Sequence, residues 1–129
     1  MLLPMEKAFD MEGAVRFQKE RLRRLREKRA VRLKQARRDF EAISGMIIEK
    51  YKPAAIYQWG SLLRENHFSE ISDIDIAVEG ITSPEDFFSL LGEAMQMTEF
   101  PLDIVQMEKI EPEFRSQILK RGRVVYERP

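Results

Sequence analysis

Apolar residues recur at steps of three and four along the N-terminal part of the chain, which is the pattern of an amphipathic helix. The predicted helix covers residues 12–51, and its apolar stripe consists of Leu22, Leu25, Leu33, Ala36, Phe40, Ile43 and Ile47. Arg29 interrupts the stripe, and Gly45 weakens the helical pattern. Such a helix would be ~60 Å long, too long for a small domain to cover. We therefore expect the half from about Leu33 to pack on the core and the first half to project or to pair with another molecule.

The remainder of the chain alternates between short β-prone runs and helical segments. Strands are predicted at residues 55–59, 74–78, 102–105 and 124–126. Helices are predicted at 85–97, where Ser83 and Pro84 favour a helix start, and at 113–121, between Pro112 and Gly122. The pattern indicates an α/β (α+β) domain with a small mixed sheet of about four strands and helices packed on it. Residues 1–32 would form a helical N-terminal extension and residues 33–129 the domain.

The amino-acid composition excludes several kinds of functional site. The chain has 129 residues, 43% of them hydrophobic, which suits one domain with a single core. It has no cysteine, which excludes disulfides, thiolate metal sites and cysteine nucleophiles. His67 is the one histidine and lies in a polar segment, where we expect a surface residue. Because no apolar run is long enough to span a bilayer, we expect a soluble cytoplasmic protein without membrane contact.

Charge is distributed very unevenly along the chain. The 22 basic and 22 acidic residues cancel, yet residues 1–40 hold 13 basic against 6 acidic residues and residues 41–129 hold 9 against 16. Between Arg16 and Arg38 there are twelve basic residues and two acids, Glu20 and Glu27. A merely solvated helix usually mixes the two signs. Three interpretations therefore stay open: contact with nucleic-acid phosphates, docking on an acidic partner, or a coiled-coil arm that could also form an oligomer.

Three carboxylates are predicted to share one patch of the sheet. Asp73 and Asp75 alternate with buried isoleucines, so both should point away from the core, and Asp103 holds the same kind of position in the third strand. Neighbouring carboxylates repel each other unless a cation intervenes, and oxygen ligands are those that Mg²⁺ prefers. Gly60 and Ser61 end the first strand in a turn whose backbone can approach a phosphate closely.

A hydrophobic residue before Gly60-Ser61, a gap of eleven residues, and Asp73-Ile74-Asp75 between hydrophobics resemble the signature of the DNA polymerase β-like nucleotidyltransferase superfamily. The short chain, the third acid in Leu102-Asp103-Ile104-Val105 and the closing segment 122–127 most resemble the minimal nucleotidyltransferases (MNT). Proteins of this family are typically partnered with HEPN ribonuclease toxins. The resemblance covers about residues 33–127.

The resemblance implies the nucleotidyltransferase fold and a reaction with Mg²⁺ and ATP. Asp73, Asp75 and Asp103 would be the catalytic residues and would hold two Mg²⁺ ions. Gly60 and Ser61 would bind the nucleotide phosphates together with Arg64, the first basic residue after the turn. Family antitoxins are known to transfer AMP to a tyrosine of the partner toxin, so the chain would be a protein adenylyltransferase that acts by AMPylation.

The chain departs from the family pattern after the Gly-Ser turn, where Leu62-Leu63 stands in place of an arginine and a small residue. Two other functions are alternatives. One is a non-catalytic module that neutralises a partner by contact or binds nucleic acid through its basic helix. The other is a small-molecule nucleotidyltransferase of the aminoglycoside-modifying type, although the second domain usual in that type is missing.

Overall fold

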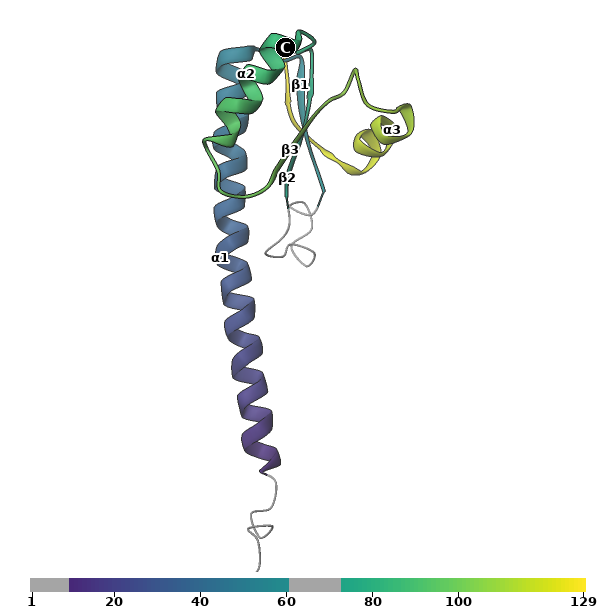
Figure 1. Ribbon diagram of the computed structural model, residues 1–129. Coiled ribbons are helices and arrows are strands. Elements are labelled where there is room, and N and C mark those ends of the chain that lie inside the picture. The colour runs from purple at the N-terminus through teal and green to yellow at the C-terminus, as the bar shows by residue number, and fades with distance from the viewer. Residues whose placement is uncertain (1–9, 61–72) are drawn as a thin grey trace, which may run out of the picture.

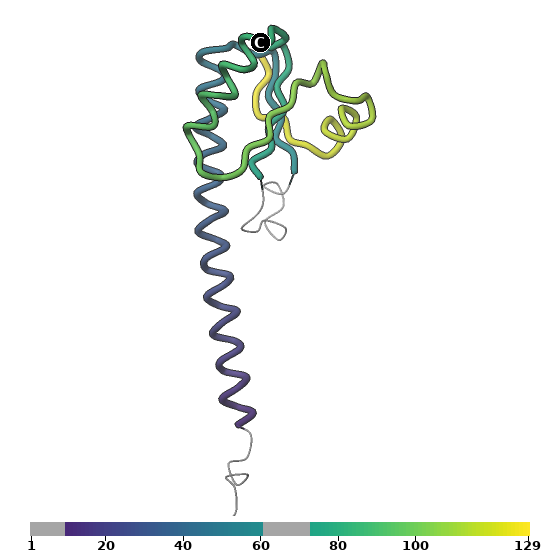
Figure 2. Tube along the Cα trace, in the orientation of Figure 1, coloured from purple at the N-terminus to yellow at the C-terminus, as the bar shows by residue number. Residues whose placement is uncertain are grey.

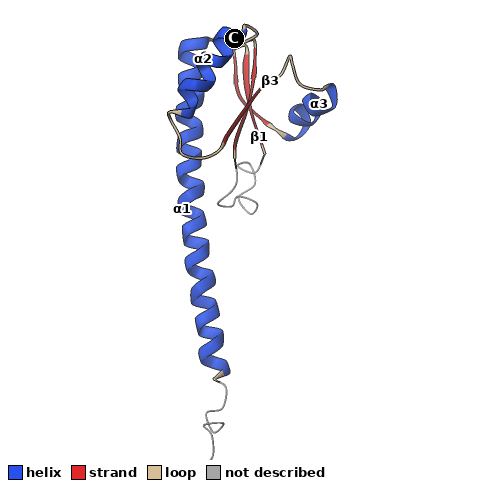
Figure 3. Cartoon of the chain, in the orientation of Figure 1, coloured by secondary structure: helices blue, strands red, loops and turns tan. Residues whose placement is uncertain are grey.

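The computed structural model describes residues 10–60 and 73–129, which form three helices and one four-stranded sheet (Figures 1 and 3). The order is α1 (Met11–Tyr51), β1 (Ala55–Trp59), β2 (Ile74–Glu79), α2 (Pro84–Met95), β3 (Leu102–Gln106), α3 (Pro112–Arg121) and β4 (Arg123–Glu127). The predicted α/β fold with a long N-terminal helix is confirmed.

The long helix α1 is continuous, as its hydrophobic pattern predicts. It begins at Asp10, whose side-chain Oδ1 accepts a hydrogen bond from the backbone N–H of Gly13 at 2.8 Å. It ends at Lys52 in a left-handed conformation, just before Pro53. Gly45 does not break the helix, because it lies on the exposed side with no neighbouring atom within 4 Å of the position a Cβ would take.

The second helix, α2, ends two residues earlier than its sequence pattern predicts. Its start is capped by the Ser83 side chain, which accepts a hydrogen bond from the backbone N–H of Asp86. At its other end the backbone N–H of Gln96 bonds to Glu93 and that of Met97 to Ala94, a spacing of three residues. These bonds tighten the last turn and end the α-helix at Met95.

The sheet has the strand order β3-β2-β1-β4 and is mixed. β1 pairs antiparallel with β2 and β4, whereas β2 and β3 are parallel and are joined through α2. Helices α1 and α2 lie on one face of the sheet and α3 lies on the other (Figures 1 and 2). The sheet is thus the middle layer of three.

The main core lies between the sheet and the α1–α2 layer. Side chains alternate along β2, so Ile74, Ile76 and Val78 all point into this core and are fully buried. Helix α1 contributes side chains at steps of three and four, and the buried hydrophobic ones are Leu33, Ala36, Phe40, Ile43 and Ile47. The predicted packing half of α1, from Leu33 onward, is therefore confirmed.

A smaller core lies between the other face of the sheet and α3. It contains Ala55, Tyr57, Ala77, Met107 and Ile118. Arg115 fixes α3 to the sheet, because its Nη1 donates to the Met107 carbonyl at 3.0 Å and its Nη2 to Glu79 Oε1 at 2.8 Å. This second core occupies the start of β1 and leaves the other end of the same face for polar residues.

The N-terminal half of α1 extends beyond the domain. Its contacts with the domain begin where the Arg32 guanidinium lies over the Phe100 ring, at 4.9 Å, and continue at Asp39, whose Oδ2 accepts a hydrogen bond from Thr98 Oγ1 at 2.7 Å. Residues 11–31, here called the arm, project ~30 Å past this point (Figure 1). In the part of the chain that the structure describes, no helix is both long and apolar enough to cross a membrane.

Candidate active site

Two of the three predicted acids are direct neighbours in the sheet. Asp75 is the second residue of β2 and Asp103 is the second residue of β3, and the parallel register pairs them. Strands lie ~4.8 Å apart, so the two carboxylates share one face beside each other. Asp73 directly precedes the first residue of β2, at the end of the sheet where Asp75 and Asp103 lie. The predicted alternation, with isoleucines facing the core and acids facing away from it, is confirmed.

This arrangement makes ionisation of the acids unfavourable. Asp75 is 7% exposed. Its burial, and to a smaller extent the charges of Asp103 and Asp73, raise the pKa of its carboxyl to about 7. The pKa of Asp103 is raised as well, first by burial and then by Asp73. No basic side chain of the described residues offsets these effects on Asp75, so the site favours a bound cation.

Gly60, which directly follows β1, lies close against Asp75. Its φ is +81°, a left-handed conformation that side chains rarely adopt. A Cβ at this position would also lie only 1.9 Å from Asp75 Oδ2. Glycine is therefore required twice, by backbone conformation and by the close approach of the carboxylate. Ser61, Arg64 and His67 lie outside the described residues.

Trp59 lies beside Asp75 in the sheet and contacts α3. Trp59 pairs in register with Asp75, so both residues face the α3 side of the sheet. The Trp59 ring meets Phe114 of α3 edge to face, with centroids 5.0 Å apart. The indole Nε1 of Trp59 is buried and donates to no described residue. Trp59, predicted to be a core residue whose edge could meet a nucleotide, thus lies both against the second core and beside the acids.

The contact between Arg123 and Gln58 at this end of the sheet was not predicted from the sequence. Arg123 Nε and Nη2 both donate to Gln58 Oε1, at 3.1 and 2.8 Å. The two residues are neighbours in the β1–β4 register, and Gln58 also pairs with Ile76, which faces the main core. Arg123 therefore lies on the opposite face from Asp75 and does not neutralise it. Pairing of β1 with the last strand of the chain leaves no local signal in the sequence.

The donor set suits Mg²⁺ in its chemistry, since it consists of adjacent carboxylates without a basic partner in the described chain. Within the described residues, however, no three acidic or histidine side chains are gathered closely enough to enclose a metal ion. Asp75 and Asp103 are neighbours in the register of β2 and β3. Binding a metal between them would require rotation about their side-chain bonds, which leaves the backbone unchanged.

Residues 41–129, which include the whole sheet and every candidate site residue, match the family model described as polymerase beta, nucleotidyltransferase. The chain belongs to this family. The match leaves out the arm and the first part of the packed half of α1. Among curated proteins, the chain has no match.

Solved structures similar to this nucleotidyltransferase include a toxin–antitoxin and a minimal nucleotidyltransferase. One is the crystal structure of a toxin–antitoxin with AMP-PNP, with 20% identity, a TM-score of 0.57, and coverage of 68% of this chain and 73% of the other. The second is described as a minimal nucleotidyltransferase, with 23% identity, a TM-score of 0.57, and coverage of 70% and 92%. At these identities the likeness shows the fold, and it confirms the resemblance to minimal nucleotidyltransferases.

Proposed function

We propose that this nucleotidyltransferase is a Mg²⁺-dependent protein adenylyltransferase, which transfers AMP from ATP to a hydroxyl of a partner protein. The observation that carries the proposal is the pair of neighbouring carboxylates, buried Asp75 and half-buried Asp103, with Gly60 close against Asp75. Paired carboxylates beside a glycine turn can serve both a metal and a phosphate group. The family match supports nucleotidyl transfer as the reaction class.

In this mechanism each element has a separate task. Asp73, Asp75 and Asp103 would hold the two metal ions, whose positive charge lets an anionic nucleotide enter an acidic site and stabilises the attacking and leaving oxygens. The backbone at Gly60, together with Ser61 and Arg64, would bind the nucleotide phosphates. The ring edges of Trp59 and Phe114 would form one wall of the site.

The transfer itself is an in-line displacement at the α-phosphorus of ATP. The acceptor hydroxyl forms the new O–P bond, the bond between the α-phosphorus and the bridging oxygen to the β-phosphate breaks, and pyrophosphate leaves. Asp103 accepts the proton of the acceptor hydroxyl.

We further propose that the acceptor is a tyrosine of a HEPN-type toxin and that the chain is the antitoxin of the pair. Support comes from the fold it shares with the toxin–antitoxin that was solved with AMP-PNP. The shared nucleotidyltransferase fold extends over 68% of this chain. The acceptor would lie at the open end of the acid face, where α3 does not cover the sheet.

The test is incubation with ATP labelled at the α-phosphorus, Mg²⁺ and a tyrosine-bearing toxin as acceptor. The label should move to the acceptor, whereas ATP labelled at the γ-phosphorus should leave it unlabelled. Replacing both Asp73 and Asp75 by Asn should abolish transfer, while Glu99→Gln, an exposed acid outside the site, should not.

Undiminished transfer by the double variant would contradict the mechanism. A non-catalytic module gives a different result, because it would bind the toxin without labelling it. Mg-ATP would then leave the melting temperature unchanged, since only a ligand that binds the folded state raises it.

A further inference from the structure

The arm carries an apolar stripe that continues the buried stripe of α1 into solvent. Its positions follow the spacing of a coiled coil, alternating steps of three and four: Met11, Val15, Gln18, Leu22, Leu25 and Arg29. Four of the six are apolar, and Gln18 and Arg29 are the polar exceptions. We call this set the arm stripe. Leu22 is 49% and Leu25 46% exposed, so nothing in the described chain covers them. The arm thus has the hydrophobic half of a two-helix interface without its partner.

The charges on the arm are sorted by helix face. Its two acids within the basic run, Glu20 and Glu27, are seven residues apart and occupy the outer face, opposite the arm stripe. Both form ion pairs with Arg23, and Glu20 also pairs with Arg24 at 3.4 Å. The Arg23 hydrogen bond is the main cause that lowers the pKa of Glu20, to about 2. The two acids of the basic run from Arg16 to Arg38 are therefore in ion pairs on the face away from the arm stripe.

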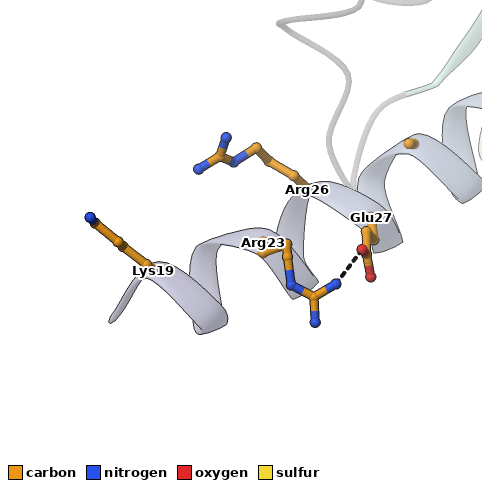
Figure 4. Close-up of a pocket in the computed structure, with 5 residues that line it drawn as sticks. Lys19, Arg23, Arg26 and Glu27 are labelled. Carbon is orange, nitrogen blue, oxygen red and sulfur yellow. Dashed lines mark hydrogen bonds and ion pairs between the residues drawn. The ribbon is translucent and has the colours of Figure 1, made fainter. Parts of the chain in front are cut away.

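The positions that flank the arm stripe are all basic from residue 19 to residue 28. They are Lys19, Arg21, Arg26 and Lys28, and none of them forms an ion pair with another described residue. In Figure 4, Arg23 turns toward Glu27, whereas Lys19 and Arg26 extend from the helix into open space. These flanking positions set partner choice in coiled coils through ion pairs between the helices.

This charge pattern decides against a second copy of the chain as the partner. In a parallel pair of arms, Arg21 of one copy would face Arg26 of the other, and an antiparallel pair would also bring basic flanks together. Like charges across such an interface are destabilising. A helix with an apolar stripe and acidic flanks would instead form ion pairs along both edges.

From these features we infer that the arm is a docking site for an acidic amphipathic helix of a partner protein. The arm projects from the end of the sheet that holds the acids, because the Asp39–Thr98 contact lies beside the start of β3. A partner on the arm would therefore lie on the same side of the domain as the candidate active site (Figure 1). The inference goes beyond nucleotide transfer and does not require it.

The test uses the full chain and three fluorescent helical peptides of about three heptads. The first has Leu and Ile in its stripe and Glu at the flanks, the second has the same composition in scrambled order, and the third has Lys at the flanks. Fluorescence anisotropy in ~0.15 M salt measures binding without nucleotide, so failure here is distinct from failure of transfer. We expect the first peptide to bind ~10-fold tighter than the scrambled one and ~100-fold tighter than the Lys peptide.

Matched variants separate the stripe from general charge attraction. Changing both Leu22 and Leu25 to Ser should weaken binding of the acidic peptide ~10-fold. Val31→Ser is the control, because Val31 is 69% exposed but lies on the opposite side of the helix. This substitution should change the affinity less than twofold, which corresponds to less than about 0.4 kcal/mol. Circular dichroism of each variant checks that α1 stays helical.

Three outcomes would overturn the inference. One is equal binding of the ordered and scrambled peptides, or no effect of the double Leu substitution. Another is a dimer in sedimentation equilibrium that the same substitution dissociates, which would identify a second copy as the partner. The third is a nucleic-acid duplex that binds more tightly than the acidic peptide and is indifferent to Leu22 and Leu25, which would assign the arm to phosphate contact.

Discussion

Replacing Asp75 by Asn should stabilise the metal-free protein at pH 8. Burial and the neighbouring carboxylates raise the pKa of Asp75 from 3.8 to about 7 in the folded chain. The folded state therefore retains a proton that the unfolded state releases between these two values. The contribution of Asp75 to stability is fully present below pH 3.8, and it is lost as the pH rises to about 7.

The size of the effect follows from the difference of about three pH units between the two pKa values. At 1.36 kcal/mol per unit, ionised Asp75 costs about 4 kcal/mol at pH 8. Asparagine removes the charge and keeps the shape, but its buried amide also loses water. We therefore expect the free energy of unfolding to rise by about 2–4 kcal/mol. For a domain of this size, that raises the melting temperature by about 10 °C or more.

The assay is thermal unfolding in chelator, followed by circular dichroism from pH 4.5 to pH 8. The gain of Asp75→Asn over the wild type should increase through this interval and level off above pH 7. The control is Glu99→Gln, which neutralises an exposed acid outside the site and should show no such increase. A gain that does not depend on pH, or an Asn variant less stable than the wild type at pH 8, would refute the reasoning.

Other predictions follow from single contacts. Gly60→Ala should destabilise by about 1–3 kcal/mol in chemical denaturation, because of its positive φ and the carboxylate next to it. Gly45→Ala, on an open helix surface, should instead stabilise by about 0.5–1 kcal/mol. Phe40→Ala should cost about 3–5 kcal/mol because it empties the main core, whereas Val31→Ala in the arm should stay within about 0.5 kcal/mol. Mg-ATP should change the fluorescence of Trp59, the single tryptophan, which lies beside the acids.

The elements of the fold were predictable because their signals are local. Alternation along residues 74–78 predicts a strand with isoleucines on the core side, and the structure has this strand. The break of the stripe at Arg29 marks the region where α1 leaves the domain, since Leu33 is the first buried hydrophobic residue of this helix. Helix starts at Pro84 and Pro112 also match, because proline suits the first turn.

The long-range arrangement was not predictable in the same way. Spacing in the sequence places Asp75 and Asp103 on the same kind of face, but only the parallel β2–β3 register makes them neighbours. The pKa of Asp75 depends on this pairing and on burial. Neither the pairing nor the burial can be predicted from the sequence of one strand alone. The Arg123–Gln58 pair likewise depends on β4 joining β1, residues far apart in the chain.

The arm shows a second limit of sequence reasoning. The uneven charge predicts an interaction surface and leaves nucleic acid and an acidic partner open, with a coiled coil compatible with either. The projecting helix adds which residues stay exposed and which acids are already in ion pairs. The positions that flank the arm stripe from residue 19 to residue 28 are therefore all basic, whereas the acids lie on the outer face of the helix. This distribution of charge favours an acidic helix as the partner.

The central claim is that the acids of β2 and β3 form a metal-dependent nucleotide site. Isothermal titration of ATP into the full chain, with Mg²⁺ and again with chelator, tests it most directly. We predict binding with Mg²⁺, weakened at least ~10-fold by chelator and lost when Asp75 or Asp103 is replaced by Asn. ATP binding of equal strength without Mg²⁺, or unchanged binding by both variants, would contradict the account.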